Sequence, residues 1–382
     1  MKLLHTSDLH LGLRMGEYSL IEDQRYILDQ IINIATKQGV DYLIIAGDVY
    51  DKAIPSAEAV SLFDYFLTAL SRASVKVLLI SGNHDSAERL AFASALIEDS
   101  GVRISPVFSG GIEPIVDRDQ HGEVRFYLLP FIKPASVRRF YPDCTELSYT
   151  EAVKLVVDGM KLNTDIRNIL VTHQFVTGAT RSESEEISVG GTDNVDSSVF
   201  SDFDYVALGH IHSPQCCGKE TVNYSGTPLK YSLSEVNDKK SVTLVELFEK
   251  GRVQINRIPL TPLRDLSLIK GSYNEITARS FYDGRGITGD YLGVCLTDEL
   301  DVPDAISKLR VIYKNLVKLW YENSRTANMQ KLCDQEDGLS RDPMELFEEF
   351  YRLRNGNDMT EAQHAYMKSV IEKVWEEADE TD

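Results

Sequence analysis

The chain has 382 residues, of which 43% are hydrophobic, enough for one large folded core with one or two smaller appendages. Polar residues interrupt the short apolar stretch between Met1 and Asp8, and nowhere do about 18 uncharged apolar residues follow one another, so we expect neither secretion nor a membrane span. The five cysteines form no CxxC pair and favour the reducing cytoplasm over a disulfide framework.

The formal net charge of −19 is unevenly distributed along the chain. Residues 333–382 hold 15 acidic and 5 basic side chains, so these last fifty residues carry just over half of the excess. Residues 250–330, in contrast, hold 12 basic and 9 acidic side chains. Nucleic acids are bound through cations that neutralise phosphates, so the total charge argues against such a partner but says little about the middle of the chain.

Strand-like apolar runs alternate with helix-like amphipathic runs over about the first 110 residues. This alternation is typical of a layered βαβ fold. The runs predict strands at 2–6, 42–46 and 75–80 and helices at 21–37, 57–73 and 87–97.

The next part of the chain contains several strand-like runs and one clear helix, at 149–162. The predicted strands are 124–129, 168–172, 205–208, 241–247 and 253–258. We therefore expect an α/β fold over residues 1–259, in which a mixed second sheet stacks on the first and helices flank this sandwich. The stretch from Gly178 to Asn194 is rich in Ser, Glu, Gly and Thr and is predicted to be a long surface loop.

Two smaller parts follow the sandwich. Residues 263–325 are predicted to form a small α+β domain with strands at 266–270 and 291–296 and a helix from Asp304 to Trp320. Residues 340–382 are predicted to form a helical hairpin. Its two amphipathic helices, 343–353 and 361–377, carry several aromatic side chains and are separated by Asn-Gly-Asn-Asp.

Side chains of the kinds that bind metals follow five of the predicted strands. Asp8 and His10 lie two residues apart in Ser-Asp-Leu-His, and in an extended segment they would project to the same side. Asp48 stands in Ala-Gly-Asp-Val-Tyr-Asp, where the glycine allows a sharp turn. The other clusters are Asn83, His84 and Asp85 in Ser-Gly-Asn-His-Asp, His173 in Ile-Leu-Val-Thr-His, and His210 and His212 in Val-Ala-Leu-Gly-His-Ile-His.

The clusters are informative as a group more than one by one. A single Asp-x-His pair is more often a solvated turn, and a single histidine is more often a satisfied core residue. Five of the eight histidines, however, lie at strand ends together with carboxylates, which is a metal-ligand set. The remaining three, His5, His121 and His364, are interpreted as structural or surface residues.

Seven nitrogen and oxygen ligands without a thiolate indicate two divalent cations, with Mn²⁺ favoured over structural zinc and Mg²⁺ as the alternative. Two neighbouring cations need an anionic bridge, for which Asp48 is the candidate. Such a site stays electropositive, attracts a phosphate and activates water. The predicted ligands are Asp8, His10, Asp48, Asn83, His173, His210 and His212.

In their order along the chain and in their residues, the five clusters resemble the motifs of the metallophosphoesterase, or calcineurin-like, superfamily. The resemblance implies a catalytic role beside the phosphate for His84, and Asp85 as the carboxylate that orients it. It also divides the ligands between two metals, with Asp8, His10, Asp48 and His212 around one and Asp48, Asn83, His173 and His210 around the other.

The flanking segments are similar to the bacterial SbcD nuclease family. The similarity lies in His-Thr-Ser-Asp-Leu-His-Leu-Gly, in Ala-Gly-Asp-Val-Tyr-Asp followed by Pro55, and in the run from Phe203 to Lys239, where Thr227 and Tyr231 depart from the usual pattern. It implies a DNA nuclease of repair and recombination, a double-strand exonuclease and single-strand endonuclease that depends on ATP through an SbcC-type ATPase.

The same resemblance implies partners for the rest of the chain. Residues 263–325 would cap the DNA, and residues 340–382 would dock on the coiled-coil ATPase. The second apolar face of 57–73, formed by Leu62, Tyr65 and Phe66, suggests a homodimer and hence a heterotetramer. The first DNA-contacting candidates are Lys308, Arg310, Lys314 and Lys318.

Simpler alternatives stay open at this point. The capping domain can be a merely structural appendage, and the hairpin can pack on its own core. A phosphodiesterase of small molecules or cyclic nucleotides and a non-enzymatic phosphate-binding scaffold are the competing functions.

Overall fold

The computed structural model describes residues 1–144, 146–180, 194–326 and 343–379. The chain forms two compact units, Met1–Asp265 and Leu266–Asp382. None of the helices in these described ranges is long and apolar enough to cross a membrane.

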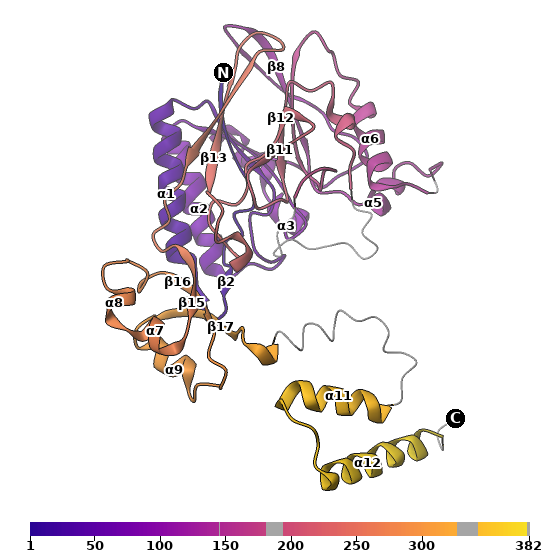
Figure 1. Cartoon of the computed structure of the whole chain (residues 1–382). Helices are drawn as coiled ribbons and strands as arrows, with labels where there is room; N and C mark the ends of the chain where they lie inside the picture. The colour runs from indigo at the N-terminus through magenta and orange to yellow at the C-terminus, as the bar shows by residue number, and fades with distance from the viewer. Residues whose placement is uncertain (145, 181–193, 327–342, 380–382) are drawn as a thin grey trace. The chain divides into compact units, whose positions relative to one another are not determined.

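Two six-stranded sheets make up the centre of the first unit (Figure 1). In each sheet four neighbouring strands are parallel, and antiparallel strands lie at one edge of the first sheet and at both edges of the second. The first sheet has the order β14 (Val253–Pro259), β13 (Ser241–Leu247), β1 (Lys2–Thr6), β4 (Tyr42–Ala46), β5 (Lys76–Ile80) and β6 (Val102–Ile104). The second has the order β11 (Gln215–Cys217), β12 (Lys219–Tyr224), β10 (Tyr205–Gly209), β9 (Arg167–His173), β8 (Gly122–Leu129) and β7 (Ile115–Asp119).

The two sheets pack face to face through an apolar core. Leu3, Ile44 and Leu78 from the first sheet share one buried cluster with Phe126 and Val171 from the second. Every residue of β4 is buried, as expected for a parallel strand covered on both faces. The predicted α/β sandwich flanked by helices is confirmed.

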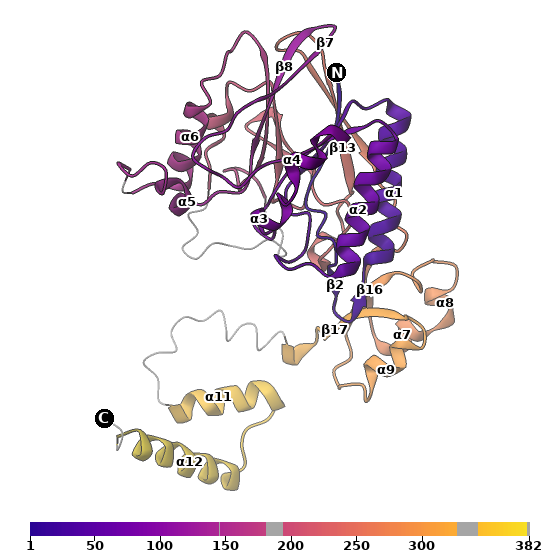
Figure 2. The same cartoon turned by 180° about the vertical axis from the view of Figure 1, so that it is seen from behind.

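Helices cover the outer faces of both sheets, and Figure 2 shows α1 (Ile21–Gln38) and α2 (Ala57–Arg72) side by side on the first. Gly39 is the C-cap of α1 and has a φ of 62°, which ends the helix. Ser56 is the N-cap of α2. On the second sheet lie α5 (Pro134–Arg138) and α6 (Tyr149–Gly159). The remaining short elements of this unit are β2 (Arg14–Met15), β3 (Tyr18–Ser19), α3 (Ala87–Leu90), α4 (Ser94–Ile97), η1 (Glu98–Ser100), η2 (Ser197–Phe200) and η3 (Leu233–Glu235).

Two details of the first unit differ from the sequence predictions. The single helix predicted at 87–97 is divided into α3 and α4, because Ala93 adopts a φ of 59°, which an α-helix does not accommodate. Helix α2 also lacks the second free apolar face that suggested a homodimer, since Leu62 and Phe66 are buried within the unit. Most of the predicted Gly178–Asn194 loop lies outside the described residues.

The second unit begins with a parallel three-stranded sheet. Its strands are β15 (Leu266–Gly271), β16 (Tyr291–Leu296) and β17 (Asn315–Tyr321), accompanied by α7 (Tyr273–Thr277), α8 (Arg279–Tyr282) and α9 (Ala305–Arg310). The helix predicted from Asp304 to Trp320 is therefore wrong beyond Arg310. Apolar residues at 309, 313, 316 and 320 have helical spacing, but backbone pairing with β16 makes the second half a strand.

The chain ends in two helices, α11 (Pro343–Asn355) and α12 (Glu361–Asp379), as the predicted hairpin requires. His364 of α12 lies 2.6 Å from the Glu348 carboxylate of α11, so a polar contact joins the helices. Phe350 and Tyr366 are exposed on them. The side chains of residues 372–379, which include the predicted apolar members at 374 and 375, lie outside the described ones.

Candidate metal centre

The structure brings the side chains of all seven predicted ligands together at the carboxyl ends of parallel strands. The ends of β1, β4 and β5 in the first sheet meet those of β9 and β10 in the second. The grouped residues are Asp8, His10, Asp48, Asn83, His173, His210 and His212.

Several of these residues have left-handed backbone conformations. The φ angles are 51° at Asp8, 43° at His10, 48° at Asp48 and 101° at His210. The expectation that Asp8 and His10 lie in an extended segment is therefore wrong. The segment folds along the loop after β4 instead, because the backbone N–H groups of Asp8 and His10 donate to the carbonyl oxygens of Gly47 and Asp48, both at 3.0 Å. Such strain is typical of functional sites, where surrounding structure holds it.

Glycines allow the ligand loops to approach one another closely. A Cβ atom at Gly82 would lie 2.1 Å from Asp48 Oδ1, and one at Gly209 would lie 1.8 Å from the Ala46 carbonyl oxygen. Gly47, directly before Asp48, has a φ of 89°, as its predicted turn requires. Only residues without a side chain fit at these positions.

Asp48, the predicted bridging carboxylate, lies close to histidines of both ligand groups. Its Oδ2 atom lies 3.2 Å from His173 Nε2 and 3.8 Å from His10 Nε2, and its Oδ1 atom accepts the backbone N–H of His84 at 2.9 Å. Burial opposes ionisation, but His173 and His10 hold the pKa of Asp48 well below its usual range. Burial likewise opposes protonation of His173, yet the Asp48 carboxylate raises the pKa of His173 to about 9.

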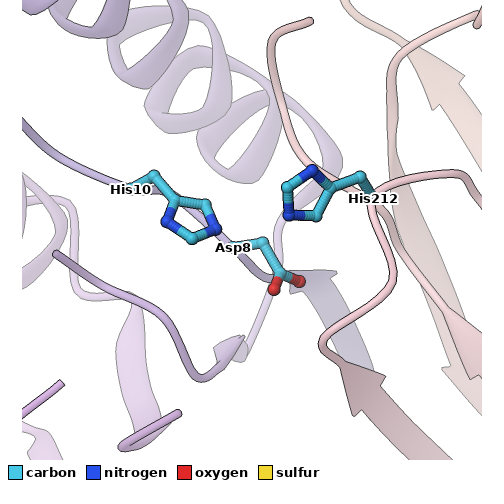
Figure 3. Close-up of side chains that lie close together, drawn as sticks. All are labelled: Asp8, His10 and His212. Atoms are coloured by element: carbon cyan, nitrogen blue, oxygen red, sulfur yellow. The ribbon is translucent and has the colours of Figure 1, made fainter. Parts of the chain in front are cut away.

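One ligand group combines Asp8, His10 and His212, whose side chains converge in Figure 3 and offer ligand atoms within 4.8 Å of one another. Burial raises the pKa of Asp8 to about 6 and lowers the pKa of His10 to about 3. Among the described residues, neither ring nitrogen of His10 has a hydrogen-bond partner. Orphaned buried nitrogens are costly, and a bound cation would satisfy one of them, so these residues fit a metal.

The second group has Asn83 between two imidazole rings. The Asn83 Oδ1 atom lies 3.0 Å from His173 Nε2 and 3.0 Å from His210 Nδ1. The other nitrogen of His173, Nδ1, lies 2.8 Å from the Ala46 carbonyl oxygen. That carbonyl can only accept, so Nδ1 carries a proton and Nε2 is the atom that can bind a cation.

His84, the predicted catalytic residue, lies beside these groups. Its ring centroid is 4.8 Å from that of His10, and its Nδ1 atom is 3.1 Å from the Asp51 carbonyl oxygen. The ring is half-buried and therefore accessible to a substrate.

The Asp85 carboxylate, predicted to orient His84, is hydrogen-bonded to backbone groups instead of to the His84 ring. Its carboxylate accepts the backbone N–H groups of Val49, Tyr50 and Gly82, at 3.1, 3.0 and 3.0 Å. Burial and the Asp48 charge raise the pKa of Asp85 to about 6. Asp85 therefore ties the loops after β4 and β5 together, while a backbone carbonyl faces the His84 ring.

Sequence reasoning missed Glu235, which is fully buried and lies 3.2 Å from His212 Nδ1. Lys240 donates to the same carboxylate at 2.6 Å. Burial works against ionisation, but these two partners lower the pKa of Glu235 to about 2. No local pattern in the sequence marks a carboxylate that meets its histidine only after folding.

A cleft of about 510 Å³ lies next to the ligand groups. It is lined on one side by Asp51, whose carbonyl faces His84, and by Tyr231, whose ring lies 5.7 Å from that of His10. Arg14 and Lys52 also line it. The cleft therefore places an aromatic side chain and two positively charged side chains beside residues that contact His84 and His10.

Comparisons with known proteins identify the family of the chain. The family model of calcineurin-like phosphoesterases matches residues 1–214, and the SbcD C-terminal model, described as the type 5 capsule protein repressor C-terminal domain, matches residues 262–355. The chain is 31% identical over 378 residues to the D subunit of the nuclease SbcCD from Staphylococcus epidermidis, covering 97% of this chain and 98% of that protein.

Two solved structures match part of this chain at 14% sequence identity. A dimetal phosphatase from Danio rerio has a TM-score of 0.42, covering 68% of this chain and 99% of its own. A protein of Thermus thermophilus has a TM-score of 0.37, with 67% and 98% covered.

Proposed function

Because the chain belongs to the calcineurin-like phosphoesterase superfamily and, within it, to the SbcD nuclease family, we propose that it is a DNA nuclease that hydrolyses phosphodiester bonds with two divalent cations. The observation that carries the proposal is the convergence of carboxylates, imidazoles and an amide oxygen at five strand ends. A DNA substrate is supported by the name of the staphylococcal relative, a nuclease, and by the match along nearly the whole chain.

The ligand groups suggest how the cations are held. Asp8, His10 and His212 would hold one and Asn83, His173 and His210 the other, with Asp48 between them. Two bound divalent cations would polarise the phosphate and supply a nucleophile by lowering the pKa of water. Oxygen and nitrogen ligands without thiolate favour Mn²⁺, with Mg²⁺ as the alternative.

The chain's own groups would complete the reaction. The Asp51 carbonyl holds Nδ1 of His84, so Nε2 is the atom that would face a bound phosphate and protonate the leaving oxygen. Arg14 and Lys52 would attract the backbone phosphates of DNA into the cleft, and Tyr231 would shape its floor.

The second unit supports a role in DNA binding and assembly. We place the DNA-contacting candidates Lys308, Arg310, Lys314 and Lys318 on or next to α9 and β17. The exposed Phe350 and Tyr366 give α11 and α12 apolar surface that a coiled-coil ATPase of the SbcC type can cover, and ATP dependence would follow from that partner. The proposed assembly is a homodimer, and with the ATPase a heterotetramer; the resemblance to the SbcD family suggests it, whereas the α2 face that first indicated a dimer is buried.

The test uses purified full-length protein with linear DNA and Mn²⁺. We expect degradation, and we expect His84→Gln to lower the rate by about 10²–10⁴-fold while both metals stay bound. His121→Gln, remote from the cleft, is the matched control. A protein that binds two metals and hydrolyses a cyclic nucleotide but leaves every DNA substrate intact would contradict the nuclease proposal.

A further inference from the structure

We propose that Glu235 is a positioning residue that fixes the His212 ring with its Nε2 atom toward the metal group of Asp8 and His10, and that Lys240 holds Glu235 in place. The inference rests on the proposed two-metal function. Neither the Glu235 carboxylate nor the Lys240 ammonium group belongs to the predicted ligand set, and both would act at one of the two metals.

The surrounding donors hold the Glu235 carboxylate in one position. Glu235 lies in η3 and is fully buried. Its Oε1 atom is 3.2 Å from His212 Nδ1, and its Oε2 atom accepts from Lys240 Nζ at 2.6 Å. The backbone N–H of Tyr231 and the hydroxyl of Thr227 also donate to Oε2, both at 3.4 Å. A buried carboxylate with this many donors has one orientation.

The Glu235 carboxylate determines which nitrogen of His212 carries the proton. An ionised carboxylate only accepts hydrogen bonds, so the proton of the neutral His212 ring must be on Nδ1 when that atom meets Glu235. Nε2 then keeps the lone pair that a metal needs. A buried carboxylate alone would be costly to ionise, but the Lys240 ammonium, only 6% exposed, supplies the opposite charge.

Lys240 also fixes the backbone of His212. Its Nζ atom donates to the His212 carbonyl oxygen at 3.0 Å and to Asp238 Oδ2 at 3.1 Å. The backbone N–H of Thr227 donates to the same carbonyl oxygen at 3.0 Å. Ring and main chain of this one ligand are therefore held by the same pair of charged residues.

The two ligand groups differ in what orients a histidine ring, a side-chain carboxylate in one and a backbone carbonyl in the other. In the other group His173 is oriented by a backbone carbonyl, that of Ala46, which no substitution of a side chain removes. Loss of the Glu235 carboxylate should therefore affect the His212 site selectively. Substitution of a residue that orients a metal-bound histidine typically lowers metal affinity by about 10–100-fold.

The experiment compares wild-type protein with Glu235→Gln and Glu235→Ala, and with Glu220→Gln as a control at an exposed glutamate. Calorimetric titration with Mn²⁺ gives the two site affinities. In metal-free protein labelled with ¹⁵N-histidine, NMR gives the tautomer of His212, whose signals are assigned by comparison with His212→Gln. The Gln variant preserves the shape of the side chain if the Ala variant fails to fold.

We expect the Nδ1–H tautomer in the wild type and in Glu220→Gln. In Glu235→Gln the amide can either accept from Nδ1 or donate to it, so a mixture of tautomers should appear, and one Mn²⁺ affinity should fall by about 10–100-fold while the other stays unchanged. Higher Mn²⁺ should then restore the activity of this variant.

Two results would overturn the proposal. Unchanged tautomer and unchanged affinities would show that His212 needs no orienting carboxylate. An equal loss of Mn²⁺ affinity at both sites, together with a lower melting temperature, would show that Glu235 has a general structural role. If the wild type binds two Mn²⁺ ions but leaves DNA intact, the nuclease proposal fails while a selective tautomer and affinity change still supports the role of Glu235.

Discussion

The main-chain carbonyl oxygen of Asp51 lies 3.1 Å from Nδ1 of His84, so a loop backbone orients the proposed catalytic ring. The Asp51 side chain contributes nothing to this contact. The position of the loop backbone, and not the carboxylate of Asp51, therefore decides where the His84 ring points.

We predict that Asp51→Asn retains hydrolysis of DNA to within about tenfold, because the backbone carbonyl remains, whereas His84→Gln loses about 10²–10⁴-fold. Steady-state rates at saturating Mn²⁺ measure the difference. A loss in Asp51→Asn as large as that in His84→Gln would show that the carboxylate itself takes part.

Gly82→Ala should abolish binding of at least one metal. The new Cβ atom would lie 2.1 Å from Asp48 Oδ1 and would displace the proposed bridging carboxylate. Metal content after dialysis against Mn²⁺ measures the effect. Gly111→Ala is the control, since a Cβ atom there meets nothing within 4 Å, and two bound metals in Gly82→Ala would contradict the central place of Asp48.

Mn²⁺ should stabilise the folded protein through Asp48. At a free concentration of about 100 times Kd, a single site adds about 2.7 kcal/mol to the free energy of unfolding, so chelation by EDTA should lower the melting temperature. Asp48→Asn should remove most of this metal-dependent shift. An equal change of melting temperature in the wild type and in Asp48→Asn would show that Mn²⁺ binds at another site.

The stability of the sandwich should depend on Asp119 at neutral pH. Arg167 donates to both oxygens of this carboxylate, at 2.6 and 3.1 Å, and the N-terminal ammonium group of Met1 donates at 2.8 Å. The hydrogen bonds from Arg167 hold the pKa of Asp119 well below its usual range, despite opposing desolvation. Asp119→Asn should therefore cost about 2 kcal/mol at pH 7.

The sign of the pH dependence follows from this lowered pKa. The stabilisation is present above the pKa of the unfolded chain, about 3.9, and is lost as the pH falls through the lower folded value. Urea unfolding at pH 7 and at successively lower pH should show the difference between wild type and Asp119→Asn shrinking below about pH 4. Asp165→Asn, at an exposed carboxylate, is the control, and a difference independent of pH would exclude the ionic explanation.

The sequence by itself determined the α/β sandwich and which residues gather at its edge. Both follow from short-range patterns, because an apolar run marks a strand and the residues just after it lie at the carboxyl end of that strand. Asp48, His173 and His212 were found in this way. Their convergence follows from parallel strands that end on one side.

The tertiary structure alone decided how those residues are held. Asp8 and His10 leave the extended conformation because backbone bonds to the loop of Asp48 hold them, and Glu235 reaches His212 only after folding. Residues 315–321 become β17 for a similar reason, since pairing with β16 outweighs a helical spacing. In each case the conformation depends on a contact with a residue distant in sequence or on backbone pairing. The local sequence pattern contains no information on either.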